Sequence, residues 1–505
     1  MFLRSTDQAD SFLSHVNDTL HARHRAMMDS LWKVLTAGNM EDVHRLEALE
    51  HEYEHTLQSP FWQQSMEEHS HKHALTASAR RQLHVLQLDM DAVTGDTELR
   101  RRTAALWNDL NFRISTYRTE LDGGHLTKSE VKLLLQTVQN QEKREKLWRA
   151  FMKLGQEVEA GLLELRALRN SWARQKGYAN FIEWKYVNEE MDPSFIQNLM
   201  KSLRTALDSS HNQIKSQWDD LRAAKFGILP SDLRSWHYED PFLQSASFSP
   251  FTERMELSDE IVRLRKWFEA RQIPIDTLLD NAQLHPRSGK SEASFCLSID
   301  RDQDVRIACN LTADIHGLTV LLHELGHGLY ATSCDPQLPF LLRRPAHTFL
   351  SEGTAMLFER ICRVDNREWK NERLIKLYGT LAAITFEEKW YANEDIPSNE
   401  LWWDTIEDIQ GVKRPDDWNH PYWAAFPYYT TLPGTYYSYL LGEIAASQFQ
   451  QSLAAHYTDW TSVEALHELK DAIWKPGASM AWSQLLANSM FRSLDPQPMI
   501  DQFQI

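Results

Sequence analysis

Two histidines stand four residues apart in the segment Leu321–Gly328, which reads LLHELGHG. Side chains at this spacing lie on one face of an α-helix, so the imidazoles of His323 and His327 can bind one metal ion. Glu324 projects sideways, where its carboxylate can hold a water molecule without binding the metal itself. The mostly apolar run Leu318–Leu322 predicts that the helix is buried. The pattern predicts a zinc site with its own general base.

A third metal ligand is predicted in the segment 348–359, TFLSEGTAMLFE, which has the pattern of a second helix. Glu352 lies 25 residues after His327, which leaves room for the second helix to pack alongside the first. Together, His323, His327 and Glu352 form the His₂Glu set of catalytic zinc sites, which leaves a fourth position for water. Glu359 shares its face two turns later and can hydrogen-bond a ligand histidine. The sequence predicts one Zn²⁺ per chain; a buried structural pair of histidines is the alternative.

Hydroxyl and imidazole side chains gather downstream, in the segments NHPYW, FPYY and GTYYSYLLGE between residues 419 and 443. Attack on an amide places negative charge on the carbonyl oxygen, and fixed neutral donors stabilise that oxyanion. Tyr436 and Tyr439 are three residues apart and are expected to share a helix face. We predict that these two tyrosines, together with His420, are catalytic, and ordinary aromatic packing is the alternative for each tyrosine.

The elements that position these residues are expected to be mainly helical. Glycine and proline together make up 36 of 505 residues, whereas average usage gives roughly 12%. Apolar residues recur every three or four positions from about residue 10 to 225. The convincing strands are Phe295–Ile299 and Val305–Cys309, which alternate across a short polar turn and predict a β-hairpin just before the zinc helix. Its edge could hold the backbone of an extended peptide.

Two domains are predicted from a change in composition. Five X-Pro pairs punctuate residues 226–290, and each disfavours helix at the residue before the proline. We therefore expect an N-terminal helical lobe at 1–230 and a catalytic lobe at 231–505. The second lobe would contain a small sheet at about 293–310, the zinc helices at about 312–363 and the C-terminal helices.

The charge balance and the apolar pattern exclude several classes of protein. The formal charge is 54 − 71 = −17, and so acidic a surface repels phosphate backbones, which argues against nucleic acid as a partner. No run approaches 18 apolar residues, so no membrane span is expected, and the acidic N-terminus does not resemble a secretory signal. Four cysteines without CxxC spacing predict free thiols in a reducing compartment, and hence a cytoplasmic location.

Taken together, these residues resemble the thimet oligopeptidase and oligoendopeptidase F family of zinc peptidases. The resemblance is carried by HELGH at 323–327, by Glu352 and Glu359, and by YYSYLLGE at 436–443. Weaker blocks at 164–170, 173–181 and 475–479 extend it over roughly 160–505. The resemblance implies a two-lobed helical fold around a deep channel that admits short peptides, with the N-terminal lobe as one channel wall or lid.

The sequence departs from that family at two places. Leu350-Ser351 and Gly353-Thr354 flank Glu352, where the family usually has an acidic-aromatic pair and Pro-Ser. The family's histidine also lies closer to its tyrosine pair, so that aligning on the histidine favours Tyr428 or Tyr429. Aligning on the longer Tyr-Tyr-x-Tyr block favours the pair named above, which we adopt. The angiotensin-converting enzyme and carboxypeptidase Taq families share the zinc scaffold, and their downstream blocks fit less well.

The sequence therefore predicts a zinc metallopeptidase that cleaves short peptides. Zinc lowers the pKa of its bound water towards about 7, and Glu324 takes the proton and returns it to the leaving amine. One alternative is a peptide-binding or scaffolding protein that contains zinc without turnover. The others are a carboxypeptidase-type or dipeptidase-type enzyme and a hydrolase of non-peptide amides on the same scaffold.

Overall fold

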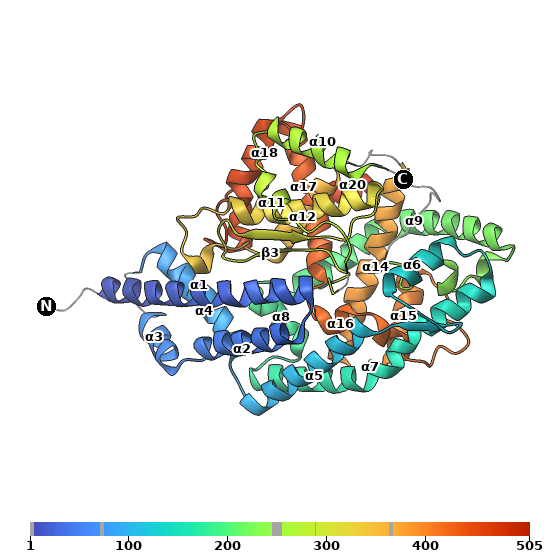
Figure 1. Ribbon diagram of the computed structural model, residues 1–505, viewed down its shortest axis with the longest axis horizontal. Helices are drawn as coiled ribbons and strands as arrows, with labels where there is room; N and C mark the ends of the chain where they lie inside the picture. Colours follow the sequence, from blue (N-terminus) through green and yellow to red (C-terminus); the bar gives the residue numbers. More distant parts are fainter. Residues whose placement is uncertain (1–4, 71–74, 245–254, 288, 363–366, 505) are drawn as a thin grey trace. The chain divides into compact units, whose positions relative to one another are not determined.

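The computed structural model describes residues 5–70, 75–244, 255–287, 289–362 and 367–504, and most of them are helical. Figure 1 shows these helices together with two small hairpins, each a separate two-stranded sheet. The predicted mainly α fold with a small sheet beside the zinc helix is confirmed. In the part of the chain that the structure describes, every helix is too short or too polar to span a bilayer.

The chain divides into two compact units, and each takes segments from both sides of residue 230. Unit 1 comprises 1–94, 251–364 and 441–499, and unit 2 comprises 95–250, 365–440 and 500–505. The division into lobes at 1–230 and 231–505 stays a prediction.

The helices and strands of unit 1 are α1 (Ser5–Ala37), α2 (Met40–Leu57), α3 (Pro60–Ser70), α4 (Ala77–Val93), α10 (Leu257–Glu269), α11 (Asp276–Asp280), β3 (Phe295–Ser298), β4 (Val305–Ala308), α12 (Ile315–Ser333), α13 (Thr348–Glu359), α18 (Val463–Leu469) and α19 (Trp482–Ala487). Those of unit 2 are α5 (Thr97–Thr116), β1 (Thr119–Leu121), β2 (Gly124–Leu126), α6 (Lys128–Thr137), α7 (Gln141–Gln175), α8 (Phe181–Asn188), α9 (Pro193–Phe226), α14 (Arg367–Ala392), α15 (Ser398–Gln410) and α16 (Tyr428–Thr431). Two helices, α17 (Tyr437–His456) and α20 (Gln497–Phe503), contain residues of both units.

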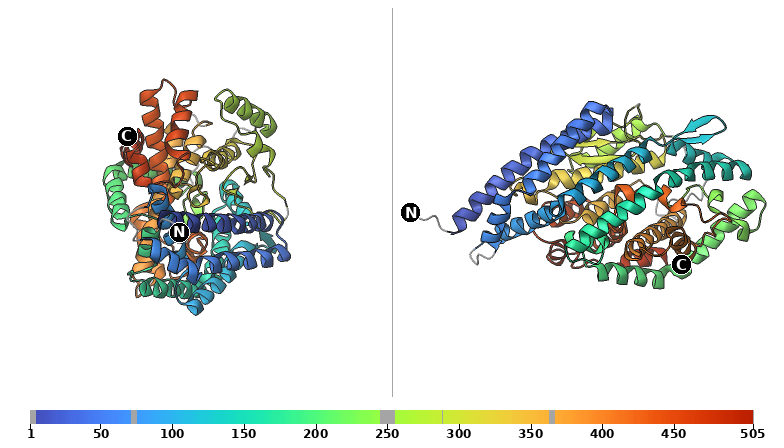
Figure 2. Two further views of the ribbon diagram at one scale, coloured as in Figure 1. Left: turned by 90° about the vertical axis from the view of Figure 1, so that its left-hand side faces the viewer. Right: turned by 90° about the horizontal axis from the view of Figure 1, so that it is seen from below.

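The core of unit 1 near its N-terminal helices is built from apolar side chains of α1, α3 and α4. Val16 and Leu20 of α1 are fully buried there, as is Leu86 of α4. Helix α1 also runs beside α2, which Figures 1 and 2 both show. Burying one apolar stripe of each helix is what holds such long helices in place.

The hairpin β3–β4 lies against α12, as the sequence predicts. It is antiparallel, with Phe295 opposite Ala308 and Ser298 opposite Val305. Val305 and Ile307 are fully buried, so the alternation seen in the sequence places one face of the hairpin in the core.

A second hairpin, β1–β2, was not expected. Its strands have three residues each, which is too short for a period-two pattern, and its segment interrupts a long helical stretch. Asp122 and Gly123 form the turn with φ angles of 51° and 80°, the left-handed conformation that tight hairpin turns require.

Unit 2 is organised around α7, a helix of 35 residues with many buried side chains. Arg144 of this helix is fully buried, and its guanidinium donates hydrogen bonds to the carbonyl oxygens of Trp236, at 2.7 Å, and Tyr238, at 2.8 Å. A buried charge of this kind ties α7 to the segment that follows α9.

Buried histidines predict that the protein loses stability in mild acid. Burial lowers the pKa of His24 and of His211 to about 3 and that of His237 to about 4. His211 stacks on Tyr378, with ring centroids 3.5 Å apart. Because the unfolded chain binds these protons more tightly, stability is fully present above pH 6.5 and is lost as pH falls from 6.5 towards 3.

Below pH 6.5, each such histidine is expected to lower the free energy of unfolding by about 1.4 kcal/mol for every pH unit. Denaturant unfolding at several pH values between 7 and 5 measures this slope. His211→Gln should reduce the slope, and His456→Gln, at an exposed position, should leave it unchanged. Equal slopes in the natural protein and in both variants would contradict the contribution of His211 to the pH dependence.

Candidate zinc site

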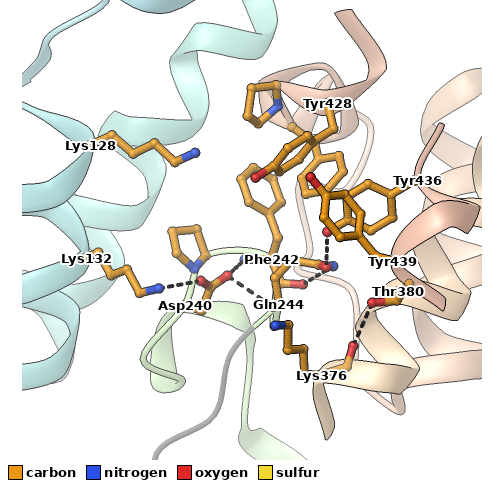
Figure 3. A pocket seen from close by; sticks show the side chains of 13 residues that line it. Lys128, Lys132, Asp240, Phe242, Gln244, Lys376, Thr380, Tyr428, Tyr436 and Tyr439 are labelled. Carbon is orange, nitrogen blue, oxygen red and sulfur yellow. Dashed lines mark hydrogen bonds and ion pairs between the residues drawn. The ribbon is translucent and has the colours of Figure 1, made fainter. Parts of the chain in front are cut away.

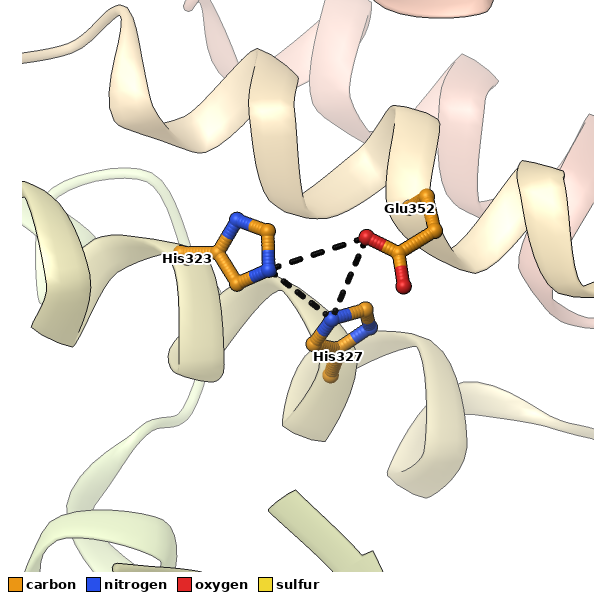
Figure 4. A group of neighbouring side chains, drawn as sticks. All are labelled: His323, His327 and Glu352. Carbon is orange, nitrogen blue, oxygen red and sulfur yellow. Dashed lines mark hydrogen bonds and ion pairs between the residues drawn. The ribbon is translucent and has the colours of Figure 1, made fainter. Parts of the chain in front are cut away.

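The two predicted ligand helices, α12 and α13, pack against each other in unit 1. Asp314 caps α12 by accepting a hydrogen bond from the backbone N–H of Gly317 at 2.9 Å. Leu321, Leu322 and Leu325 are fully buried and anchor the helix in the core. The predicted apolar burial of this helix therefore places its histidine-bearing face toward α13 (Figure 4).

Glycine allows α13 to pack closely against α12, through Gly326, and against α17, through Gly442. A Cβ at Gly326 would lie 2.6 Å from the Cα of Ala355 on α13, and a Cβ at Gly442 would lie 2.7 Å from the Cβ of Glu352. Real side chains do not come so near to a backbone, so both positions need glycine. The close approach sets the position of Glu352, which is itself buried.

Alanine at Gly326 is expected to destabilise unit 1 by about 1–3 kcal/mol, because the backbone of α13 must move. A matched control lies two residues on, in the same helix. A Cβ at Gly328 would meet side-chain ends and no backbone, the Cδ1 of Leu278 at 3.0 Å and that of Ile307 at 3.6 Å, and alanine gains about 1 kcal/mol of helix propensity there. Urea unfolding of the two variants compares them directly; a Gly328→Ala protein less stable than the Gly326→Ala protein would refute the packing argument.

The ligand atoms of His323, His327 and Glu352 converge on one point (Figure 4). The two Nε2 atoms are 3.2 Å apart, and Oε2 of Glu352 lies 3.7 Å from the first and 3.9 Å from the second. Donors that bind zinc tetrahedrally at about 2.0–2.1 Å are roughly 3.3–3.4 Å from one another. Two imidazoles and one carboxylate at these distances fit a zinc ion.

The other ring nitrogen of each histidine is also engaged. Nδ1 of His323 lies 2.6 Å from Oε1 of Glu359, and Nδ1 of His327 lies 2.8 Å from Oγ of Ser351. A carboxylate only accepts, so Nδ1–H of His323 donates, and Nε2 is the ring nitrogen that faces the other two ligand atoms. Glu359 was predicted in this position. Ser351 was not, although it stands at a position where the sequence departs from the family it resembles.

Charges and burial shift the pKa values of this group. Burial lowers the pKa of His323, but the hydrogen bond to Glu359 and the neighbouring carboxylates outweigh it and raise the pKa to about 9. Burial and the charge of His323 lower the pKa of His327 to about 3. Burial raises the pKa of Glu324 to about 7, with a further contribution from Glu352. Glu324 is only 6% exposed, next to the ligands without being one of them.

Residues 3–224 match a family model described as angiotensin-converting enzyme. This similarity supports a zinc metallopeptidase of the gluzincin type. The matched residues precede the zinc motif in sequence, so the match and the geometry of the ligands are independent observations. None of the curated proteins matches the chain. The finer resemblance to thimet oligopeptidase and oligoendopeptidase F stays a prediction.

Removing the hydroxyl of Ser351 is expected to weaken zinc binding by roughly 10- to 100-fold, the usual effect of losing the partner of a ligand histidine. Ser351→Ala leaves Nδ1 of His327 without this contact, whereas Ser351→Thr keeps a hydroxyl. Competition with a chromophoric chelator measures the zinc Kd of both variants. Equal affinities in the alanine variant and the natural protein would show that the hydroxyl does not orient the ring.

The predicted catalytic tyrosines belong to unit 2. Tyr436 donates a hydrogen bond to Oε1 of Gln244 at 2.8 Å, and its ring packs against Tyr439 with centroids 5.2 Å apart. The alternative Tyr428 also packs against Tyr436, with centroids 5.1 Å apart, while Tyr429 is buried among other aromatic rings. Their part in catalysis stays a prediction.

The predicted His420 is an exposed residue of unit 2. Its Nδ1 lies 3.2 Å from Nε2 of Gln156, and its Nε2 lies 3.9 Å from Oδ2 of Asp417. These contacts hold the ring at the surface of its unit. A catalytic role for His420 likewise stays a prediction.

Proposed function

We propose that this protein is an oligopeptidase that hydrolyses peptide bonds in short peptides with one Zn²⁺ held by His323, His327 and Glu352. The observation that carries the proposal is the convergence of these three ligand atoms beside the buried carboxylate of Glu324. A purely structural zinc site is closed by four protein ligands and has no use for a base. A three-ligand set with an adjacent base is typical of hydrolysis.

The chain's own residues provide the proton transfers. Zinc, when bound, supplies a Lewis acid that polarises a carbonyl group and acidifies water. Glu324 accepts the proton of the attacking water and transfers it to the nitrogen of the leaving amine. Glu359 and Ser351 hold the histidine rings so that both Nε2 atoms keep their orientation.

Tyr436, Tyr439 and His420 are proposed to donate hydrogen bonds to the carbonyl oxygen as negative charge develops on it. The residue types support this assignment, because hydroxyl and imidazole groups can donate hydrogen bonds while remaining neutral.

Two measurements test the proposal together: elemental analysis of the purified chain and cleavage of a quenched fluorescent peptide pool. We expect one zinc per chain and cleavage that a chelator abolishes. Zinc at unit stoichiometry without cleavage of any peptide would favour the peptide-binding alternative, and a chain that takes up no zinc would refute the proposal.

A carboxypeptidase-type or dipeptidase-type activity at the same site is the second candidate. The match of residues 3–224 to the angiotensin-converting enzyme model favours it over the remaining alternatives, because the resemblance to that family, which shares the zinc scaffold, implies a dipeptidase-type or carboxypeptidase-type mode. Mass spectrometry of a digested peptide library separates the two: internal cuts support an oligopeptidase, and cuts only near one end support the second candidate.

We also propose a cytoplasmic location without a nucleic-acid partner. The four cysteines carry free thiols in the structure, and the formal charge of −17 is unsuited to a phosphate backbone.

A further inference from the structure

Polar side chains gather at two further places in the structure. One is a cavity of about 270 Å³ in unit 2 that Tyr436 and Tyr439 line (Figure 3), and it belongs with the proposed oxyanion chemistry. The other is in unit 1, where three guanidinium groups lie close enough to interact, those of Arg301, Arg343 and Arg344. The zinc chemistry uses none of these three arginines.

Carboxylates of unit 1 pair with two of the three guanidinium groups. The two terminal nitrogens of Arg344 lie 3.0 and 3.1 Å from Oδ1 of Asp89. Nη1 of Arg343 lies 3.4 Å from Oδ2 of Asp302. Among the described residues, no carboxylate lies within ion-pair distance of Arg301. The charge of Arg301 is therefore left without a counter-ion from the protein.

The surroundings of Arg301 make this charge costly. The side chain is partly buried, and its Cζ lies 4.4 Å from the ring centroid of Phe340. Its hydrogen bond to the carbonyl oxygen of Phe340 is long, at 3.4 Å. Burial, together with the charge of Arg344, lowers the pKa of Arg301 to about 10, so the group is still charged at neutral pH. A partly buried charge without a partner is expensive, so an anion bound beside it would stabilise the folded chain.

The turn between β3 and β4 holds Arg301 in place. Its backbone has a φ angle of 54°, the left-handed conformation that few residues other than glycine adopt. Oδ1 of Asp300 accepts hydrogen bonds from the backbone N–H groups of Asp302, at 2.9 Å, and Asp304, at 3.1 Å. Backbone strain of this kind persists only where the surrounding structure enforces it, and it is common in ligand clamps. The position of Arg301 is thus set before a ligand binds.

A neutral donor lies near this guanidinium. The hydroxyl of Tyr53, on α2, is close enough to feel the charges of Arg301 and Asp89. Burial raises the pKa of Tyr53, so the hydroxyl keeps its proton and can donate it. In the part of the chain that the structure describes, this hydroxyl has no hydrogen-bond partner, and the buried Nε of Arg343 has none either. Unpartnered donors next to an uncompensated positive charge are suited to an oxyanion.

We propose that these side chains form a phosphate-binding site, with Arg301 and Tyr53 as its principal donors. Guanidinium and phosphate pair through two parallel charge-assisted hydrogen bonds, which are the strong kind. A phosphate also offers more acceptor oxygens than a carboxylate does, which suits donors from several side chains. The site goes beyond the proposed peptidase activity, and phosphate binding does not require that activity.

Calorimetric titration of the full chain with inorganic phosphate at pH 7 tests the proposal. Acetate maintains a constant ionic strength, so that a carboxylate competes throughout. We expect the Kd to rise roughly 10- to 100-fold in Arg301→Met, which loses a charge-assisted contact. We expect a rise of roughly 3- to 10-fold in Tyr53→Phe, which loses a neutral donor and keeps the ring.

Arg306→Met is the matched control, because it removes the same charge from the same hairpin. The guanidinium of Arg306 is already paired with Asp304, at 2.8 Å, and with Asp29, at 3.0 Å. This variant should therefore bind phosphate as the natural protein does. A parallel titration with methyl phosphate distinguishes free phosphate from a phosphate monoester, and the tighter ligand identifies the source.

The proposal is overturned if phosphate shows no binding at roughly ten-millimolar concentration, or if Arg301→Met and Tyr53→Phe bind it as tightly as Arg306→Met does. Circular dichroism checks that each variant is folded. If Arg301→Met does not fold, the conservative Tyr53→Phe variant decides the test by itself. Zinc content and peptide cleavage are measured separately, so the two proposals fail independently.

Discussion

Glu324→Gln is expected to lower turnover by about 10²- to 10⁴-fold while the protein still binds zinc. Glutamine has nearly the same shape as glutamate, but it cannot accept a proton from water or return one to the leaving amine. Glu324 is buried beside the ligands and is not among the three converging atoms, so the metal site itself should be preserved. The kcat of a fluorescent peptide and the zinc content of the same sample provide the measurement.

Glu359→Gln is the control for the Glu324→Gln experiment. Glu359→Gln also removes a negative charge near the site, but it changes the hydrogen bond to Nδ1 of His323 and leaves the base in place. It should therefore weaken zinc binding more than it lowers the kcat of the zinc-loaded enzyme. Full turnover in Glu324→Gln would eliminate this residue as the base.

Replacing Glu352 by alanine is expected to release zinc and abolish cleavage. This change removes one of three protein ligands, so the loss of affinity should exceed the roughly 10- to 100-fold effect of an outer partner such as Ser351. Elemental analysis after dialysis against a weak chelator should find about one zinc in the natural protein and almost none in the variant.

The Glu324→Gln protein is the matched control for this second experiment, because it loses the same charge from the same pocket and keeps its three ligands. Retention of stoichiometric zinc by Glu352→Ala would show that a different group completes the site. A thermal unfolding midpoint close to that of the metal-free natural protein would separate the loss of zinc from misfolding.

Much of this protein follows from patterns that are local in the sequence. His323 and His327 share a face because four residues are close to one helical turn, whatever the rest of the chain does. The hairpin β3–β4 is predictable because apolar and polar residues alternate over four or five positions in each strand, which indicates the buried face. Low glycine and proline content likewise predicts a mainly helical fold. The three-residue strands of β1–β2 are too short to show such an alternation.

Tertiary packing determined the contacts between residues that are far apart in the sequence, because no periodic pattern in the sequence predicts such contacts. Ser351 meets the ring of His327 only because α12 and α13 approach closely at Gly326. Arg144 lies 92 residues before Trp236, and the packing of unit 2 brings its guanidinium to the carbonyl oxygen of that residue. The sequence by itself determined which side chains can bind a metal and act as a base, because that depends on residue type and helical spacing. Only the packing of helices against one another, through buried apolar faces and glycine contacts, determined which neighbours orient those side chains.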